Sequence, residues 1–151
     1  MPTYEVRACS AAEIFDDPRS AGLIAEYAEE CGNALIGKPA PRRDMYENLE
    51  GSGLGHCFAA YEDGALCGFA LIIVSVVPHY GLSCATPESL FVSREANCGA
   101  ELMKAVEGYA RRNGCANIFY SAPVFSRFDR MLSLRQREYR LTNRVYTKRL
   151  A

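Results

Sequence analysis

The segment Arg94 to Ala100, REANCGA, decides how this chain is interpreted, because it joins an extended apolar run to a strongly periodic helix. The run before it, Glu88-Ser89-Leu90-Phe91-Val92, is typical of a short strand. After it, residues 100–112 place Leu102, Val106 and Tyr109 at helical spacing. The segment is therefore predicted to be a loop that opens a helix.

A loop of this kind can hold an anion. The first turn of a helix exposes backbone N–H groups without intrahelical partners, and it carries the positive end of the helix dipole. Gly99 lets a ligand approach the backbone closely, and Asn97 tolerates a left-handed conformation. Arg94 adds a cation whose fork suits phosphate oxygens. The alternative is an ordinary helix start, with a capping asparagine and a solvated arginine.

Composition indicates one soluble globular domain over residues 1–151, with 49% hydrophobic and 23% charged residues. The seven cysteines are odd in number and form no C-x-x-C pair, which argues against a disulfide framework or a zinc site, and no metal is expected. Cys57 and Cys67 lie in apolar runs and are predicted to be buried. Reduced thiols, with no leader-like segment and no apolar run long enough to span a bilayer, predict a cytoplasmic protein.

The net charge of -1 hides a gradient along the chain. Residues 1–63 carry 12 acids and 5 bases, a balance of -7, whereas residues 127–151 carry 2 acids and 8 bases, a balance of +6. Such asymmetry can mark a nucleic-acid-binding tail. Here the bases alternate with Leu141, Val145 and Tyr146, so a packed helix and strand with basic outer faces is the preferred interpretation, and nucleic acid is not the expected partner.

The predicted elements alternate between helices and strands without a repeat or linker. In order they are a strand over residues 4–8, a short helix capped by Ser10, a helix from Pro18 to about Cys31, a helix over 42–50, strands over 57–61 and 66–76, a strand ending at Val92, a helix over 100–112, a strand over 117–121, a helix over 126–137 and a closing strand over 138–149. Glu62-Asp63-Gly64 predicts a tight hairpin turn. The strand over 66–76 is almost continuously apolar and is predicted to be central.

This order of elements resembles the GNAT superfamily of N-acetyltransferases over nearly the whole chain. Leu90-Phe91-Val92, then Arg94-x-x-Asn97-x-Gly99, then Leu102-Met103 are similar to the strand, phosphate loop and helix of that family. The Pro78-His79-Tyr80 loop and the tyrosine-rich end are similar to phage-type and putative bacterial members. The resemblance implies an α/β (α+β) fold, with a mixed, largely antiparallel central sheet flanked by helices.

The resemblance also implies acetyl-coenzyme A as cosubstrate. Backbone groups near Phe91 and Val92 would hold the thioester carbonyl and the pantetheine arm. Arg94 and the N–H groups from Ala96 to Ala100 would bind the pyrophosphate; the residues concerned are Ala96, Asn97, Cys98, Gly99 and Ala100. The chain departs from the family pattern at two positions. Asn97 replaces a glycine of the loop, and Leu134 stands where many members carry the tyrosine that protonates the leaving thiolate.

Candidate catalytic groups follow from the chemistry of amine acetylation, which needs a base for the amine and an acid for the thiolate. Glu88 is expected to share a strand face with Leu90 and Val92 and to take the amine proton through water; a solvated carboxylate is the alternative. Tyr120 and Tyr146 are substitute proton donors or simply packing aromatics. His79 and Tyr80 could border the acceptor site or lie free on the surface. Cys98 is predicted to be a small buried side chain, because no histidine adjoins it.

Three functions therefore remain open. The first is an N-acetyltransferase that transfers the acetyl group of acetyl-coenzyme A to a primary amine, on a small molecule or a peptide, by direct attack on the thioester. The second, favoured by Leu134, is a catalytically weak or inactive coenzyme A-binding module on the same fold. The third is a nucleic-acid-binding protein that uses the basic end. A homodimer is compatible with the sequence, which does not specify the acceptor.

Overall fold

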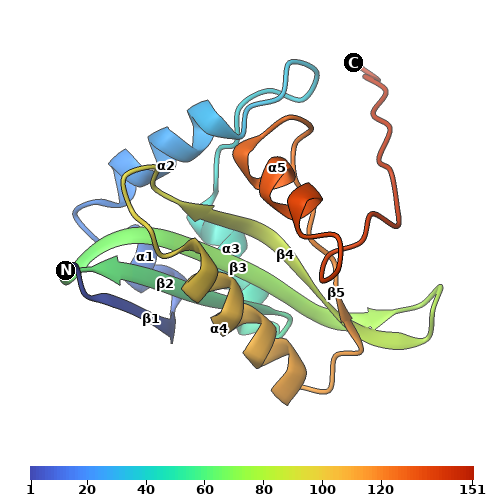
Figure 1. The fold of residues 1–151 in the computed structure, drawn as a ribbon, viewed down its shortest axis with the longest axis horizontal. Helices are drawn as coiled ribbons and strands as arrows, with labels where there is room; N and C mark the ends of the chain where they lie inside the picture. The colour runs from blue at the N-terminus through green and yellow to red at the C-terminus, as the bar shows by residue number, and fades with distance from the viewer.

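A computed structural model describes all residues from Met1 to Ala151. Its centre is a five-stranded sheet in the order β1-β2-β3-β4-β5, with helices on both faces (Figure 1). The strands are β1 (Tyr4–Cys9), β2 (Gly55–Glu62), β3 (Ala65–Val77), β4 (Leu82–Val92) and β5 (Asn117–Ile118). The helices are α1 (Ala11–Phe15), α2 (Ser20–Glu30), α3 (Arg43–Gly51), α4 (Gly99–Arg112) and α5 (Arg127–Leu134). The predicted α/β fold with a largely antiparallel central sheet is confirmed.

The β2–β3 hairpin has the turn that the sequence predicts. Glu62 pairs with Ala65, so Asp63 and Gly64 alone form the loop. Both have positive φ, 48° for Asp63 and 81° for Gly64, as the favoured two-residue hairpin turn requires. β3 then pairs with β2 on one side and β4 on the other, and Leu66 to Ile72 are all buried. The prediction that this strand is central is therefore confirmed.

The sheet separates two hydrophobic cores. On one face α1, α2 and α3 cover a cluster that includes Ile14, Leu23, Phe69 and Phe91. On the other face α4 packs against a second cluster through Leu102 and Val106, both fully buried. Figure 1 shows α4 lying across the sheet on the side opposite α1 and α3. Alternation along the strands divides neighbours between these faces: Phe91 belongs to the first core and Val92 to the second.

β4 is irregular and only partly paired. Leu71 pairs with Ser89 and Ile72 with Pro87, so Glu88 is an extra residue in a β-bulge. On its other side β4 pairs with β5, in parallel, only at Cys84 and Ala85. The second half of β4, up to Val92, therefore has one edge without a neighbouring strand.

Two predictions about the last third of the chain need correction. The strand predicted over residues 117–121 is limited to Asn117 and Ile118. The closing strand predicted over 138–149 is absent, because the segment after α5 runs outside the sheet without secondary structure (Figure 1). The helix predicted over 126–137 is the shorter α5, with Ser126 as its N-cap. None of the helices is long and apolar enough to cross a membrane.

Candidate active site

The candidate site lies at the end of β4, where the strand meets the loop 93–98 and α4. Phe91 is buried beneath α2 and packs against Tyr27, with ring centroids 5.4 Å apart. Val92 is buried on the side of α4. Because the outer edge of β4 is unpaired here, its backbone groups can bind an extended ligand in the way that a neighbouring strand would.

The loop 93–98 is fixed by a carboxylate from α2. Glu26 Oε1 accepts a hydrogen bond from the backbone N–H of Arg94 at 2.8 Å and another from Ser93 Oγ at 3.2 Å. The N–H of Ala96 donates to the carbonyl of Ser93, and that of Asn97 donates to Tyr4 Oη at 3.3 Å. The predicted donors Ala96 and Asn97 are thus already hydrogen-bonded within the protein.

The N–H groups without an acceptor in the protein follow the loop directly, in the first turn of α4. Leu102 is the first residue of this turn whose N–H has a backbone acceptor, the carbonyl of Cys98, so Gly99, Ala100 and Glu101 keep theirs free. A Cβ added at Gly99 would meet no atom within 4 Å, so the space beside this backbone is open. These observations fit a phosphate at the N-terminus of α4.

Asn97 does not adopt the left-handed conformation that its side chain would tolerate. Positive φ among non-glycine residues is confined to Asp63 and Phe125, so the loop needs no glycine at position 97. Cys98 is fully buried, as predicted, and its Sγ lies 3.3 Å from Cys67 Sγ. Burial is the main reason why the pKa of both thiols is raised, and both are held as neutral thiols. This agrees with a packing role rather than a nucleophilic one.

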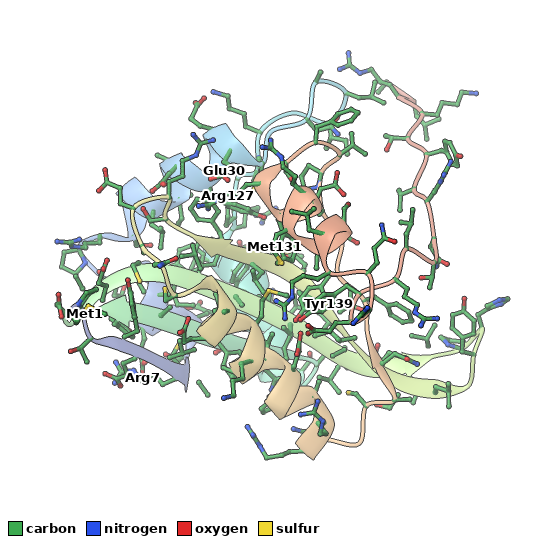
Figure 2. The ribbon with its side chains drawn as sticks, in the orientation of Figure 1. Met1, Arg7, Glu30, Arg127, Met131 and Tyr139 are labelled. Atoms are coloured by element: carbon green, nitrogen blue, oxygen red, sulfur yellow. The ribbon has the colours of Figure 1, made fainter.

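Two arginines meet at Glu30, the last residue of α2. Glu30 Oε1 lies 3.0 Å from Arg127 Nε, and Glu30 Oε2 lies 3.5 Å from Arg94 Nε. Arg127 Nη2 also donates to the carbonyl of Val92 at 2.7 Å. Figure 2 shows Glu30 and Arg127 adjacent where α2 approaches α5. A 9% exposed carboxylate therefore holds two cations, one from the loop and one from α5, beside the end of β4.

Glu88 has a different setting from the predicted one. The bulge removes it from the face of Leu90 and Val92, so the expectation of a shared face is wrong. Its side chain is exposed, and its charge acts on Tyr27 and Tyr46, which belong to α2 and α3. Burial first, and then neighbouring charges that include Glu88, raises the pKa of Tyr27 to about 12. The carboxylate thus points to the side of the sheet that α2 and α3 cover.

Tyr46, on α3, contacts β4 next to Glu88. It is buried, and its hydroxyl lies 2.7 Å from Ser89 Oγ, the residue that follows Glu88 on β4. Its ring packs edge-on against Phe15, with centroids 5.3 Å apart. Burial raises the pKa of Tyr46, so it stays a neutral hydroxyl near Glu88. α2 and α3 therefore present aromatic side chains beside a free carboxylate.

Tyr120 follows β5 and lies between α4 and α5, where its ring packs against Phe128 with centroids 5.6 Å apart. Its hydroxyl donates to Glu107 Oε1 at 2.9 Å, and Tyr139 donates to the same oxygen at 2.8 Å. Figure 2 labels Tyr139 where the chain leaves α5. Burial first, and then the charge of Glu107, raises the pKa of Tyr120. A tyrosine held in this way packs the two helices together, and it releases its proton less readily than a free one.

The remaining predicted site residues lie elsewhere. His79 and Tyr80 form the tip of the β3–β4 hairpin, and β4 rises roughly 3.3 Å per residue, so they are about 20 Å or more along the strand from Glu88. Tyr146 is 86% exposed and makes no hydrogen bond. Leu134, which the resemblance places at the usual position of the acid, is 82% exposed. The structure therefore does not bring His79, Tyr80 or Tyr146 to the end of β4.

A cavity of about 340 Å³ borders the other side of the loop. Its charged lining consists of Glu26, Glu62, Glu95 and a single cation, Arg19. With three carboxylates against one guanidinium it disfavours a phosphate, which places the anion site on the open side of the loop. No group of three or more His, Cys, Asp or Glu residues is arranged to hold a metal ion.

Glu26, Glu30 and Arg127 carry the site together with the loop, and none of them stands out in the sequence. Glu26 and Glu30 are four residues apart and thus share a face of α2, which is a weak signal for a common role. Arg127 follows the N-cap Ser126 and resembles any other basic residue of the C-terminal part. Only the fold brings it to Val92, 35 positions earlier.

Comparison with solved structures gives the fold class. The chain is similar to a ribosomal-protein-alanine N-acetyltransferase from Brucella melitensis biovar Abortus 2308, with 17% identity, a TM-score of 0.71, and coverage of 99% of this chain and 100% of that one. It is also similar to an aminoglycoside acetyltransferase, HMB0005, from an uncultured soil metagenomic sample, with 16% identity, a TM-score of 0.72 and 99% coverage of both chains.

A third similar structure was solved with coenzyme A. It is the aminoglycoside N-acetyltransferase AAC(6')-Iy, with 16% identity, a TM-score of 0.65, and coverage of 99% of this chain and 95% of that one. At these identities the likeness concerns the fold. A search of curated proteins gave no match.

The sequence itself identifies the family. The profile of the acetyltransferase (GNAT) family matches residues 21–129, which include α2, the whole of β2 to β4, the loop and α4. The chain belongs to the acetyltransferase (GNAT) family, and the predicted resemblance is confirmed. It is an N-acetyltransferase whose acyl donor is acetyl-coenzyme A.

Proposed function

We propose that the chain transfers the acetyl group of acetyl-coenzyme A to a primary amine, by direct attack of the amine on the thioester. The observation that carries this proposal is the combination of an unpaired β4 edge with free N–H groups at Gly99, Ala100 and Glu101. In this arrangement the extended pantetheine arm of coenzyme A pairs with the free edge of β4, and the pyrophosphate binds at the N-terminus of α4. Acetyl-coenzyme A would supply the activated acyl group.

The residues that hold the donor follow from this geometry. The N–H groups of Gly99, Ala100 and Glu101 face the pyrophosphate, and Arg94 and Arg127 add positive charge beside them. Backbone groups of Phe91 and Val92 hold the arm and orient the thioester carbonyl. The carbonyl of Val92 now accepts from Arg127, so this hydrogen bond must open if the pantetheine arm is to use the same carbonyl.

Glu88 is the best placed base for the amine. It lies on the bulge, exposed, on the side of the sheet that carries Tyr27 and the buried Tyr46. A carboxylate there can take the proton of an ammonium acceptor, directly or through water, and leave the amine neutral for attack. The acceptor would enter between α2, α3 and β4, and a small-molecule or peptide amine fits this reasoning.

The proton for the leaving thiolate has no obvious donor. Tyr120 can serve only if its hydrogen bond to Glu107 breaks, and Tyr146 only if the C-terminal segment moves. Because the thiol of coenzyme A is a fair leaving group, protonation by water is sufficient for a slow reaction. We therefore expect a modest turnover rate.

The test is calorimetric binding of coenzyme A, together with thiol release from acetyl-coenzyme A in the presence of a panel of amines. Gly99→Glu places a carboxylate at the phosphate position without a steric clash in the free protein. We expect it to lower coenzyme A affinity at least tenfold while thermal stability is kept. Gly22→Glu on α2, also without neighbours around its Cβ, is the matched control. Unchanged affinity in Gly99→Glu would contradict the assignment of the loop.

Glu88→Gln tests the base. We expect kcat/KM to fall by about 10²- to 10⁴-fold, the range of general base catalysis, with coenzyme A affinity unchanged. The loss should be smaller at high pH, where the free amine is already neutral. A uniform loss at every pH, or none, would remove Glu88 from this role.

The second candidate function is a catalytically weak or inactive coenzyme A-binding module on the same fold. It is favoured by Leu134, which is exposed at the position of the usual acid and cannot donate a proton. Binding of coenzyme A without thiol release for any amine of the panel would support this alternative.

A further inference from the structure

Two of the seven cysteines touch each other where β3 meets the loop 93–98. Cys67 on β3 and Cys98, the residue before α4, have their sulfur atoms 3.3 Å apart. They are 31 positions apart in the sequence, and no other two cysteines are hydrogen-bonded to each other. The two sulfurs are only about 1.2 Å further apart than in a disulfide bond, a gap that small rotations of the side chains can close.

The backbone holds the two cysteines close together. The N–H of Ser93, at the start of the loop, donates to the carbonyl of Cys67 at 2.8 Å. The carbonyl of Cys98 accepts from the N–H of Leu102, so Cys98 is fixed to the first turn of α4. Both cysteines belong to the second hydrophobic core. The pair therefore spans the joint between β3 and the helix that carries the free N–H donors.

One of the two thiols borders a cavity. Cys67 is 6% exposed and lines the cavity of about 340 Å³ beside the loop, whereas Cys98 does not line it and is fully buried. The cavity has three carboxylates against the single guanidinium of Arg19, which disfavours an anionic oxidant such as oxidised glutathione. A neutral hydroperoxide meets no such barrier. Cys67 is therefore the thiol that an oxidant reaches first.

We propose that Cys67 and Cys98 form a site of reversible oxidation, at which a hydroperoxide joins the two sulfurs in a disulfide bond. The sulfur of Cys67 attacks one oxygen of hydrogen peroxide, which leaves a sulfenic acid on Cys67 and releases the other oxygen as water. The sulfur of Cys98 then attacks that of the sulfenic acid, the S–S bond forms, and a second molecule of water leaves. The protons of both thiols leave with the water. The peroxide gains two electrons, and the two thiols lose them.

Burial makes this reaction slow. Desolvation first, and then the neighbouring Cys98 and Glu62, raises the pKa of Cys67 to about 12, although the charge of Arg19 acts in the opposite direction. The thiolate is the reactive form of a cysteine, so only a small fraction of the molecules can react at neutral pH. The pair therefore packs as neutral thiols in the reduced protein, and it responds to prolonged exposure to an oxidant rather than to a brief pulse.

The disulfide acts on the first turn of α4. It draws Cys98 toward β3, and the next residue, Gly99, carries one of the free N–H groups assigned to the pyrophosphate. This consequence rests on the proposed function, because it concerns coenzyme A. We expect the oxidised chain to bind acetyl-coenzyme A at least threefold more weakly than the reduced chain.

The first experiment maps the bond, and it involves neither coenzyme A nor an amine. The full chain is incubated with hydrogen peroxide and digested without a reducing agent by chymotrypsin, which cuts on both sides of Cys67, at Leu66 and Phe69. Mass spectrometry should find the Cys67 peptide linked to the Cys98 peptide, and dithiothreitol should separate them. Cys57→Ala is the matched control, because it removes a buried thiol of the neighbouring strand β2 and should keep the linked peptide.

Two variants test the order of the steps, with circular dichroism to establish that each is folded. In Cys98→Ala the sulfenic acid on Cys67 has no partner, so dimedone should label Cys67. In Cys67→Ala, Cys98 should stay unlabelled. A disulfide that joins other cysteines, or labelling of Cys98 in Cys67→Ala, would overturn the proposal, and so would oxidation of Cys57 while the pair stays reduced.

The second experiment measures binding by calorimetry before oxidation, after it, and after reduction again. Acetyl-coenzyme A is the probe, because its sulfur is acylated and cannot exchange with the disulfide. The threefold loss should be reversed by dithiothreitol, and Cys67→Ala treated with peroxide should keep its affinity. Equal affinity of the oxidised and reduced chains would overturn the effect on α4. Absence of binding in both forms would instead contradict the proposed function and leave the mapped disulfide standing.

Discussion

β3 and the C-terminal arm, Arg140 to Ala151, both contain residues that favour strands, but only β3 forms one. Both are rich in β-branched and aromatic residues, yet β3 pairs along its length with β2 and β4, whereas the arm pairs with nothing in its own chain. Leu71 on β3 is fully buried, and Leu141 on the arm is 79% exposed. Strand propensity is therefore only a condition for a strand. A neighbouring edge that supplies hydrogen bonds, and a core that receives the side chains, decide whether it forms.

The largest contrast should appear on removing one leucine from each region. Leu71→Ala should lower the free energy of unfolding by about 2–5 kcal/mol, because it leaves a cavity in the first core. Leu141→Ala should change it by less than about 0.5 kcal/mol, because this side chain is exposed. Urea unfolding followed by circular dichroism gives both values. Equal losses would mean that the arm is packed in the single chain.

A second contrast concerns two glycines near the site. A Cβ at Gly68 would lie 2.9 Å from the carbonyl oxygen of Phe91, so Gly68→Ala must displace the end of β4. We expect a loss of roughly 1–3 kcal/mol in stability and weaker coenzyme A binding. Gly99→Ala, which meets open space, should leave stability unchanged. A Gly68→Ala variant with both properties intact would show that β4 adjusts freely.

The buried thiols make the core, and not the arm, sensitive to alkali. Burial, with the charge of Glu50, raises the pKa of Cys57 from 9.0 to about 12. Above pH 9 the unfolded chain loses this proton while the folded chain keeps it, so stability falls as the pH rises from 9 towards 12. One such group contributes a slope of at most about 1.4 kcal/mol per pH unit. The slope of urea-unfolding stability against pH should be smaller in Cys57→Ala than in the unaltered chain, and an identical slope would contradict the buried neutral thiol.

A smaller loss than in the core is expected at the start of α5, the helix that precedes the arm. Ser126 Oγ accepts from the N–H of Asp129 at 3.1 Å, and Asp129 Oδ2 accepts from the N–H of Phe125 at 2.8 Å. Ser126→Ala should cost about 1 kcal/mol in unfolding free energy, whereas Ser126→Asp should keep the cap. Thermal unfolding of both variants distinguishes them, and equal losses would mean that the hydroxyl itself, not its role as an acceptor, is needed.

Most of the fold follows from local signals. Asp63-Gly64 determines the β2–β3 hairpin, the continuous apolar run gives β3, and the caps Ser10 and Ser126 mark helix starts. The closing strand over residues 138–149 was predicted wrongly. Its sequence has the pattern of a strand, but no edge of the sheet pairs with it in the structure. β5 is only two residues long because β4 and β5 pair at two positions and then separate. The local sequence of residues 117–121 does not show where this separation begins.

The sequence predicts where the candidate site lies, but not which backbone donors are free or which way Glu88 points. The loop and the helix that follows it are where the sequence predicts them, yet the free donors begin at Gly99 rather than at Ala96. The reason is that Tyr4 and Glu26, 93 and 67 positions away from their partners Asn97 and Ser93, already bind the loop. The bulge that turns Glu88 toward α2 and α3 also depends on pairing with β3.

The strand order has a consequence for synthesis of the chain on the ribosome. β2, β3 and β4 follow one another through hairpins, and β1 pairs with β2 across the segment that contains α1, α2 and α3, so these four strands can assemble one after another as the chain emerges. The carbonyl of Val92 must wait for Arg127, and β5 must wait for α4. The four strands that include the end of β4 are therefore translated before β5 and Arg127, which complete the surroundings of the candidate site.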